Sequence, residues 1–442
     1  MDTLVLFLQL AVILAMIFIG ARVGGIGMGI YGTVGVAILV FVFGCKPGEL
    51  PVDVMLIILC VITASSCLQA AGGLDFMVSV AAKFLRKHPQ QITFFGPLTT
   101  WLLCIFAGTA HTCYALLPII SEIATKAKIR PERPLSVATI AASLGITGSP
   151  VSAATVALLS DKLLGIHGIG MKEILIVTIP ASIISILVAA FVQNFVGKPL
   201  EEDPEYQRRV REGLITPEPE PSEGEESAPL DKRAMYSVFI FLGGVVAVAL
   251  LGSFPSWRPH FNGAAMSMNP IIEMLMMVIA ALILLVSKAE VKTAIKGNVF
   301  SAGMTAMISI FGIAWMGSTF FLHNQTAITE AFSGLVSQYP ILFAVALFIF
   351  SIMLFSQAVT VKTLYPLGLA LGISPLLLLA MFPAVNGYFF LPTYPTEVAA
   401  IGFDRTGTTK IGKYVINHSF QLSGFITTLV SIGVGCLIVS FL

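Results

Sequence analysis

Two stretches, Gly145-Ile-Thr-Gly-Ser-Pro-Val-Ser152 and Asn386-Gly-Tyr-Phe-Phe-Leu-Pro-Thr-Tyr-Pro-Thr-Glu397, interrupt apolar segments in the two halves of the sequence. Each places proline, glycine and hydroxyl side chains where a membrane-spanning helix would be continuous. A break inside lipid leaves backbone N–H and C=O groups unpaired, which costs several kcal/mol for each group unless protein, water or a ligand satisfies it. Paired breaks of this kind are typical of secondary transporters, whose substrate sites lie near the middle of the membrane.

The composition is that of a polytopic membrane protein. Of the 442 residues, 56% are hydrophobic and 11% are charged, whereas a soluble domain carries about 25% charged residues. Residues 3–21 follow an N-terminus without a basic region or a small-residue cleavage site, so we expect a retained first helix. Residues 197–233 hold 11 acidic and 6 basic residues and are rich in glutamate and proline. We predict a disordered cytoplasmic linker there.

Eight apolar runs and two broken segments are long enough to cross a hydrocarbon core about 30 Å thick. The apolar runs are residues 3–21, 25–44, 52–72, 172–196, 235–254, 268–287, 299–322 and 414–441, and the broken segments are 134–160 and 374–400. Segments 93–125 and 340–372 each have two apolar arms, too short to span, on either side of a polar centre. They predict two re-entrant hairpins whose tips are buried against protein.

Positive charges orient this layout. With the N-terminus outside, 20 of the Lys and Arg residues fall inside and 4 outside, while Lys362 falls at a hairpin tip. This distribution agrees with the positive-inside rule. The order of three helices, hairpin, broken helix and helix occurs twice, and an odd number of crossings inverts the second copy. We therefore predict an all-α membrane protein of two inverted repeats, residues 1–196 and 234–442, with about ten transmembrane helices and both termini periplasmic.

The breaks supply candidate binding groups for an anion. A helix fragment that begins inside the membrane offers free N–H donors and the positive end of its dipole. Pro150 and Pro395 suit the first turn of such fragments, because proline has no N–H to leave unpaired. The hydroxyl groups beside them are candidate donors to a carboxylate: Ser149, Ser152, Thr393 and Thr396. The alternative is that these hydroxyls cap their own backbone.

The predicted hairpin tips, Gly108–Thr112 and Gln357–Lys362, add a second set of candidates. Both tips are expected to meet the broken helices near the centre of the membrane. Their polar side chains are possible contacts for a substrate or an ion: Thr109, Thr112, Gln357 and Thr360. Capping of the tips by the same side chains is the alternative.

Three ionisable residues fall at or near the breaks, where a charge is costly and usually functional. Lys362 is a candidate partner for a substrate carboxylate, or else extends its ammonium to the outer surface. Glu397 is a candidate proton or cation coupling residue. His111 is a candidate proton carrier, although a lone histidine is more often a satisfied polar side chain.

Other chemistries have no signature in the sequence. The six cysteines form no C-x-x-C pair, and no metalloprotease, phosphate-binding or nucleophile-elbow motif occurs. No basic patch interleaved with aromatic residues points to nucleic acid. We therefore expect no enzymatic activity, no metal and no cofactor. A membrane-bound transporter of a small polar, anionic solute is the reading that the residues favour.

The sequence resembles the anaerobic C4-dicarboxylate transporters, the Dcu family, over essentially its full length. The matching strings are Ala107-Gly-Thr-Ala-His-Thr-Cys-Tyr114, Ile146-Thr-Gly-Ser-Pro-Val-Ser-Ala-Ala154, Phe390-Leu-Pro-Thr-Tyr-Pro-Thr-Glu397, Phe403-Asp-Arg-Thr-Gly-Thr-Thr409 and Val415-Ile-Asn-His-Ser419. Where familiar members have aspartate after Pro-Thr, this chain has Glu397, which keeps the carboxylate but changes its reach.

The resemblance implies a carrier of the bacterial inner membrane that exchanges fumarate, malate or aspartate for succinate during fumarate respiration. It also implies membership of the ion-transporter superfamily, whose members use inverted repeats and often an elevator movement. Some members of the family control a dicarboxylate-sensing histidine kinase, so such a kinase is a candidate partner, and a homo-oligomer is left open. A cation-coupled symporter of another organic anion and a dicarboxylate co-sensor are the alternatives.

Overall fold

The computed structural model describes residues 3–23, 25–50, 52–159, 163–215, 231–354, 356–392, 394–412, 414 and 417–442. Within these residues the chain is almost entirely helical. The one antiparallel strand pair of this part joins β1 (His260–Phe261) to β2 (Ala264–Ala265). The all-α class predicted from the sequence is confirmed.

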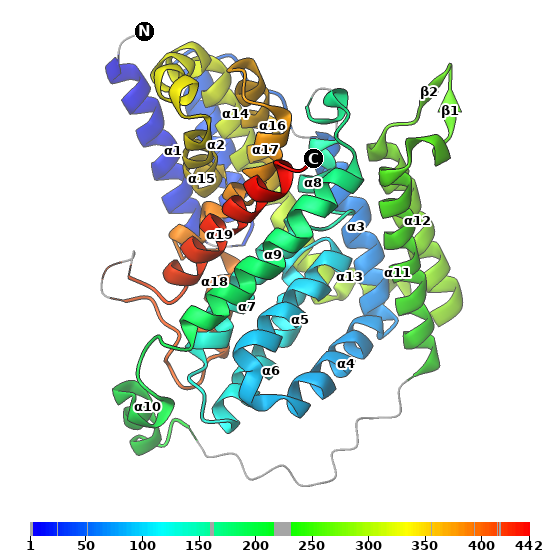
Figure 1. The fold of residues 1–442 in the computed structure, drawn as a ribbon, viewed down its shortest axis with the longest axis vertical. Helices are drawn as coiled ribbons and strands as arrows, with labels where there is room; N and C mark the ends of the chain where they lie inside the picture. The colour runs from blue at the N-terminus through cyan, green and yellow to red at the C-terminus, as the bar shows by residue number, and fades with distance from the viewer. Residues whose placement is uncertain are drawn as a thin grey trace.

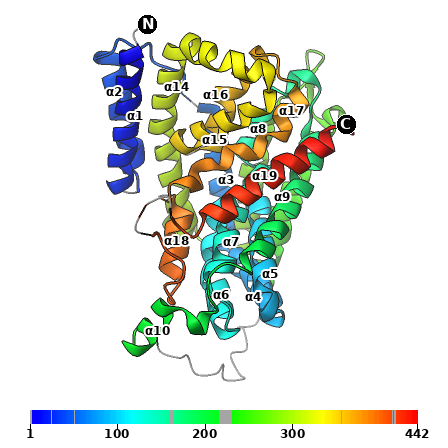
Figure 2. The same cartoon turned by 60° about the vertical axis from the view of Figure 1, so that its left-hand side comes forward.

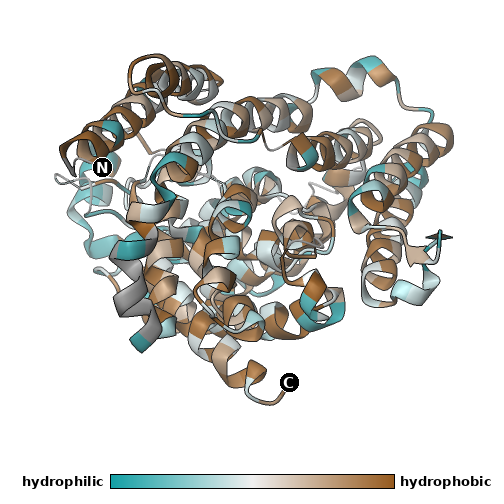
Figure 3. Ribbon diagram, turned by 90° about the horizontal axis from the view of Figure 1, so that it is seen from above, coloured by the Kyte–Doolittle hydropathy of each residue, from teal (hydrophilic) through white to brown (hydrophobic). Residues whose placement is uncertain are grey.

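Several helices of the described part meet the requirements for crossing a bilayer. Five are long and apolar enough, and two bent helix pairs raise the number to seven. The five are α9 (Met171–Gln193), α11 (Lys232–Ser253), α12 (Met268–Ser287), α14 (Asn298–Gln338) and α19 (Gln421–Val439). Viewed from above, much of the helical ribbon is coloured as hydrophobic (Figure 3). The fold is therefore that of a polytopic membrane protein, while the count of ten crossings stays a prediction.

The other helices of the first half include a helical hairpin and an interrupted helix. Helices α5 and α6 are separated by residues 108–112, and α7 and α8 by residues 148–152. The bounds are α1 (Thr3–Val23), α2 (Gly27–Phe41), α3 (Val52–Ala70), α4 (Gly73–Lys87), α5 (Ile92–Ala107), α6 (Cys113–Lys126), α7 (Glu132–Thr147) and α8 (Ala153–Leu158). Helix α4, which the sequence analysis did not anticipate, leaves α3 at an angle of 73°.

The second half has a comparable order. Helices α15 and α16 are separated by residues 355–356, and a 3-10 helix, η7, precedes the break before α18. The bounds are α13 (Val291–Lys296), α15 (Phe343–Leu354), α16 (Gln357–Ala370), α17 (Pro375–Ala380), η7 (Phe382–Phe390) and α18 (Pro395–Phe403). In Figures 1 and 2, α1, α2 and α14 form a group on one side, and α9 and α19 lie side by side away from it. The division into two inverted repeats stays a prediction.

Glycines bring α2 and α14 into backbone contact. A Cβ atom built on Gly32 would lie 2.5 Å from the carbonyl carbon of Gly312 and 2.6 Å from the nitrogen of Ile313. Gly29 approaches the backbone at Ile308 in the same way. Small residues permit this close approach, which is how helices pack without a hydrophobic driving force inside lipid.

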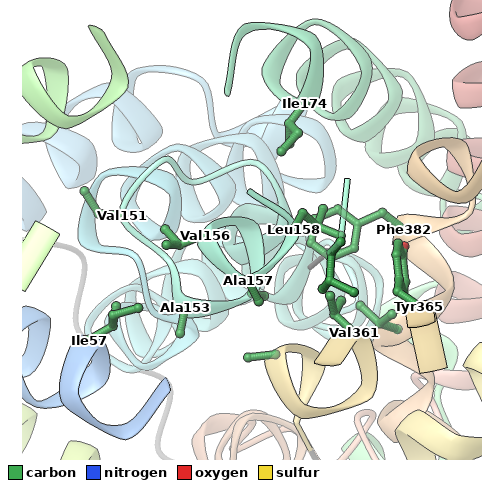
Figure 4. Close-up of a cluster of buried hydrophobic side chains, with 14 of the residues drawn as sticks. Ile57, Val151, Ala153, Val156, Ala157, Leu158, Ile174, Val361, Tyr365 and Phe382 are labelled. Carbon is green, nitrogen blue, oxygen red and sulfur yellow. The ribbon is translucent and has the colours of Figure 1, made fainter. Parts of the chain in front are cut away.

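The short helix α8 belongs to the largest buried apolar cluster. Its Ala153, Val156 and Leu158 are buried, and Figure 4 shows them among side chains from α3, α9, α16 and η7. Ile57 of α3 belongs to the same cluster. A six-residue helix has little stability of its own, so burial of this kind holds α8 in place.

The first part of the predicted linker is ordered, so the expectation of disorder over all of 197–233 is wrong. Residues Leu200–Glu202 form a 3-10 turn and Pro204–Arg211 form α10. The Asp203 carboxylate caps α10 by accepting hydrogen bonds from two of its first N–H groups, and it also accepts one from the Arg130 guanidinium. Proline at the first helical position and a capping aspartate strongly favour the start of a helix. The acidic composition of the whole segment pointed to disorder instead. Residues 216–230 lie outside the described residues.

Buried ion pairs join α10 to the start of α7. Burial alone would raise the pKa of the Asp203 carboxyl, but the N–H of Tyr206 and the Arg130 guanidinium lower the pKa below its ordinary value. Arg130 also pairs with Glu132, and both side chains of that pair are buried. Removing one partner would leave an uncompensated buried charge, which is strongly destabilising.

The loop after α18 is built around Asp404. Its carboxylate accepts hydrogen bonds from the N–H of Thr409 at 2.6 Å and from the hydroxyl of Thr408 at 2.8 Å. Thr408 also accepts the N–H of Glu132 at the start of α7, at 3.2 Å. Ser419 donates to the Glu132 carboxylate at 2.6 Å. The string Phe403–Thr409 therefore forms a turn after α18 that is hydrogen-bonded to the start of α7.

Some predicted boundaries differ from the observed ones. The run predicted at 299–322 continues as helix to Gln338, and the run at 414–441 becomes helical only at Gln421. The segment before Gln421 is instead held by an isolated bridge between Ile411 and His418. Hydropathy marks the lipid-crossing part of a helix and not its ends, which are set by hydrogen bonds and capping.

Candidate functional site

The tip of the first hairpin is shaped by glycine and two threonines. Helix α5 ends at Gly108, which has a φ of 66°, a conformation that glycine adopts without strain. Thr109 Oγ1 accepts the N–H of His111 at 3.3 Å, and the hydroxyl of Thr112 donates to the Thr109 carbonyl at 3.1 Å. These bonds turn the chain sharply, so that Thr109 and His111 reach the cavity described below.

The first helix break satisfies much of its own backbone. The hydroxyl of Ser152 donates to the carbonyl of Ile146 at 2.7 Å, and its oxygen accepts the N–H of Thr155 at 3.2 Å. Ser149 Oγ accepts the N–H of Val151 at 3.3 Å. Both serines thus act as local caps, the alternative that the sequence left open.

The second break ends where α18 starts. Tyr394 has extended backbone at the N-cap, and Pro395 occupies the first helical position. Glu397 lies in the first turn, fully buried, and its Oε2 accepts the hydroxyl of Thr396 at 3.1 Å. Its Oε1 has no hydrogen-bond partner among the residues that the structure describes. A carboxylate in the first turn is favoured by the helix dipole.

Gln357 joins the second hairpin to both broken segments. Its Nε2 lies 3.0 Å from the carbonyl oxygen of Ser143 on α7 and 3.0 Å from the hydroxyl oxygen of Tyr388 in η7. It also donates to the Asn386 side-chain oxygen. All four residues are buried. One amide group therefore fixes the tip of this hairpin relative to the two breaks.

A cavity lies between α3, α14, the two hairpin tips and the two breaks. Its volume is about 110 Å³, which is below the range of about 300–1,000 Å³ typical of sites for drug-sized ligands. The lining residues are Ile57, Ile58, Val61, Ile62, Gly108, Thr109, His111, Ile146, Val151, Ala153, Ala154, Gly303, Ile310, Ser356, Gln357, Ala358, Tyr388 and Tyr394. Apolar walls with a few polar groups are the usual composition of such sites.

The structure places only part of the predicted site residues at this cavity. Those that line it are Thr109, His111 and Gln357. Others are buried in the same hairpins and breaks but are not among the lining residues: Thr112, Ser149, Ser152, Thr360, Thr396 and Glu397. Thr393 lies outside the described residues. The binding roles of all these residues stay predictions.

Lys362 is not at the hairpin tip, so that part of the expectation is wrong. Helix α16 already begins at Gln357, because the hydroxyl oxygen of Ser356 accepts the N–H of Val359 at 3.4 Å and caps it. Lys362 therefore lies in the second turn of α16. Its Nζ is 3.3 Å from Oδ2 of Asp53, in the first turn of α3.

Two tyrosines of the cavity wall were not anticipated. The rings of Tyr388 and Tyr394 are stacked, with centroids 4.3 Å apart and planes inclined by 29°. Both lie inside the stretch that marked the second break, but aromatic residues in an apolar run read as core. Their hydroxyls gave the only hint of a polar role.

The cavity offers neutral hydrogen-bonding groups. Hydroxyl, amide and imidazole groups are suited to holding a polar solute whose ends accept hydrogen bonds. Among the described residues no group of three or more His, Cys, Asp and Glu side chains could hold a metal ion. The arrangement therefore fits recognition of a small polar molecule by hydrogen bonds.

Fold and cavity together define an all-α polytopic membrane protein with an internal polar site. The sequence profile of the anaerobic C4-dicarboxylate membrane transporters matches residues 5–442. The chain is 42% identical over 431 residues to the anaerobic C4-dicarboxylate transporter DcuB of Escherichia coli O157:H7, covering 96% of each chain. It is 40% identical over 437 residues to the C4-dicarboxylate transporter DcuA of Helicobacter pylori, covering 97% of each. The chain belongs to the family of anaerobic C4-dicarboxylate membrane transporters.

Two solved structures resemble the fold at low sequence identity. One is MtrF of Neisseria gonorrhoeae, described with a class of antimetabolite efflux pumps, with a TM-score of 0.49, 14% identity and coverage of 91% of this chain and 84% of that one. The other is the YdaH transporter of Alcanivorax borkumensis, with a TM-score of 0.49, 14% identity and coverage of 86% and 84%.

Proposed function

We propose that the chain is a secondary transporter that exchanges C4-dicarboxylates, such as fumarate, malate, aspartate and succinate, across the bacterial inner membrane. The observation that carries the proposal is the cavity between the two hairpin tips, whose apolar walls hold a few hydrogen-bonding side chains, in a chain of this family. Thr109 and His111 come from one tip, Gln357 from the other, and Tyr388 from the second break. A four-carbon diacid carries a carboxylate at each end, so donors on opposing elements suit it.

The predicted residues take distinct roles in this proposal. Thr109 and Gln357 contact the substrate directly, and the threonine and serine hydroxyls of the two breaks complete the site by holding the helix ends. Glu397 is the coupling residue, because a buried carboxylate at membrane depth is costly and is retained mainly for function. The hydroxyl of Thr396 donates a hydrogen bond to this carboxyl group and fixes its position.

The orientation follows from charge. An inside excess of lysine and arginine supports periplasmic termini and a cytoplasmic position for α10. The two halves are proposed to be inverted repeats, with hairpins 93–125 and 340–372 entering from opposite sides. A sensor histidine kinase as partner is a prediction that only the family resemblance supports, and a homo-oligomeric state is left open.

Counterflow in proteoliposomes tests the transport proposal. Vesicles loaded with succinate are expected to take up labelled fumarate, malate or aspartate faster than unloaded vesicles. Uptake that needs a sodium or proton gradient and ignores internal succinate would instead favour the symporter. Absence of counterflow for every C4-dicarboxylate, with correctly inserted protein, would refute exchange.

A matched pair of glutamine variants tests the site. Gln357→Ala removes the amide that joins the hairpin to both breaks and is expected to reduce counterflow at least tenfold, on the order of one lost hydrogen bond to a charged group. Gln207→Ala removes an exposed glutamine on α10 and is expected to leave counterflow unchanged. Equal rates for the two variants would remove Gln357 from the site.

A further inference from the structure

An ion pair joins the two helices that face each other across the cavity. Ile57 of α3 and Ala358 of α16 both line the cavity. Asp53 precedes Ile57 by four residues, and Lys362 follows Ala358 by four. Residues four apart share one face of a helix, so both charged side chains lie one turn beyond the lining, at the same end of the cavity. Their Nζ and Oδ2 atoms are 3.3 Å apart.

This end of the cavity is not covered by the rest of the protein. The Asp53 side chain is 66% exposed and that of Lys362 is 28% exposed. Glu273 of α12 interacts electrostatically with Asp53, so a second carboxyl group lies nearby. An arriving anion therefore meets a lysine whose charge is already engaged by a carboxylate of the protein.

We propose that the Asp53 carboxylate competes with the substrate for Lys362: it pairs with the Lys362 ammonium until a carboxylate of an arriving dicarboxylate displaces it. The inference rests on the proposed function and adds an entrance contact to it. The same ammonium that binds Asp53 has the charge and hydrogen-bond donors that a substrate carboxylate requires. A diacid leaves one carboxylate on Lys362 while the other advances toward the hairpin tips, which an uncharged solute of the same size cannot do.

The two partners are expected to have opposite effects on the apparent affinity. Asp53→Asn removes the competitor and one negative charge, so the KM for fumarate falls. Lys362→Gln removes the site of competition, so the KM rises. Each change is on the order of two- to fivefold, the ratio that an exposed ion pair supplies, and it shrinks as ionic strength rises.

Uptake of labelled fumarate into whole cells measures these constants, because it presents substrate to the side on which α3 is predicted to begin. Lys362→Arg keeps the positive charge and is expected to return the KM toward the wild-type value. Control variants are Lys128→Gln and Glu201→Gln, which break an exposed pair with 2.8 Å between Nζ and Oε1 and are expected to leave the KM unchanged.

The outcomes separate this inference from the proposed function. If the pair only ties α3 to α16, Asp53→Asn and Lys362→Gln break the same contact and shift the KM in the same direction, which overturns the inference. Unchanged constants in both variants also overturn it, while wild-type exchange leaves the proposed function standing. Absence of exchange by the wild-type protein in vesicles overturns both.

Discussion

The contact between α2 and α14 makes a sharp prediction about one methyl group. Gly32→Ala adds a Cβ that would lie 2.5 Å from the carbonyl carbon of Gly312. Ordinary contact for such an atom begins near 3.4 Å, so the helices must separate by about 0.9 Å at this point. The atoms in the way belong to the backbone of α14, so no side-chain rotation relieves the overlap.

The magnitude follows from two opposing terms. Overpacking a tight contact costs about 1–3 kcal/mol. A gap of 0.5–1 Å along the rest of the contact between α2 and α14 also removes roughly a quarter to a half of the dispersion energy of each atom pair. Replacing glycine by alanine inside a helix returns up to about 1 kcal/mol. We therefore expect Gly32→Ala to lower the free energy of unfolding by about 1–2 kcal/mol.

Gly433 provides a matched control. It also lies inside an apolar helix, α19, but a Cβ built on it meets nothing within 4 Å. Gly433→Ala therefore gains the higher helix propensity of alanine without any steric overlap. The midpoint of thermal unfolding, measured in one detergent for all three proteins, is expected to rank Gly433→Ala at or above wild type and Gly32→Ala below both. A Gly32→Ala protein as stable as Gly433→Ala would refute the backbone contact.

Three further predictions follow from the hydrogen bonds described above. Hydrogen bonds from two arginine side chains lower the pKa of Glu205 from 4.5 to about 2. The stability that Glu205 gives to α10 is therefore complete above pH 4.5 and is lost as the pH falls toward 2. Hydrogen exchange of the α10 amides, corrected for intrinsic rates, should accelerate only between these two pH values. Ser152→Ala removes the cap of α8 and is expected to lower stability by about 0.5–2 kcal/mol, visible as a lower unfolding midpoint than that of Ser152→Thr. Tyr388→Phe keeps the ring stack but removes the hydroxyl that contacts Gln357, so counterflow of fumarate should slow while unfolding shifts by about 0.5–1.5 kcal/mol; an unchanged rate would exclude this hydroxyl from the site.

The fold class and the positions of the interruptions could be predicted because their causes are local. A run of about 20 apolar residues has few alternatives to a membrane helix. Proline and glycine disrupt a helix wherever they fall in it. The structure has non-helical backbone at residues 148–152 and at Leu391, inside the stretches Gly145–Ser152 and Asn386–Glu397.

The composition of the cavity wall could be predicted only in part, because it depends on contacts between distant segments. Gln357, for example, donates a hydrogen bond to Ser143 over a separation of 214 residues. Lys362 was misplaced because a capping serine one residue before α16 starts that helix earlier than the charge pattern suggested. Nothing in hydropathy distinguishes a hydroxyl that caps its own helix, such as that of Ser152, from one that faces a solute.

The cluster around Asp404 has a mechanical consequence for the walls of the cavity. One interrupted helix begins at Glu132, and the other ends at Phe403. Thr408 and Ser419, in the segment after Phe403, hydrogen-bond to Glu132 and so connect these two helix ends. Movement of one of these helix ends is therefore coupled to movement of the other. A rearrangement that carries substrate across the membrane while these hydrogen bonds stay intact moves both interrupted helices together.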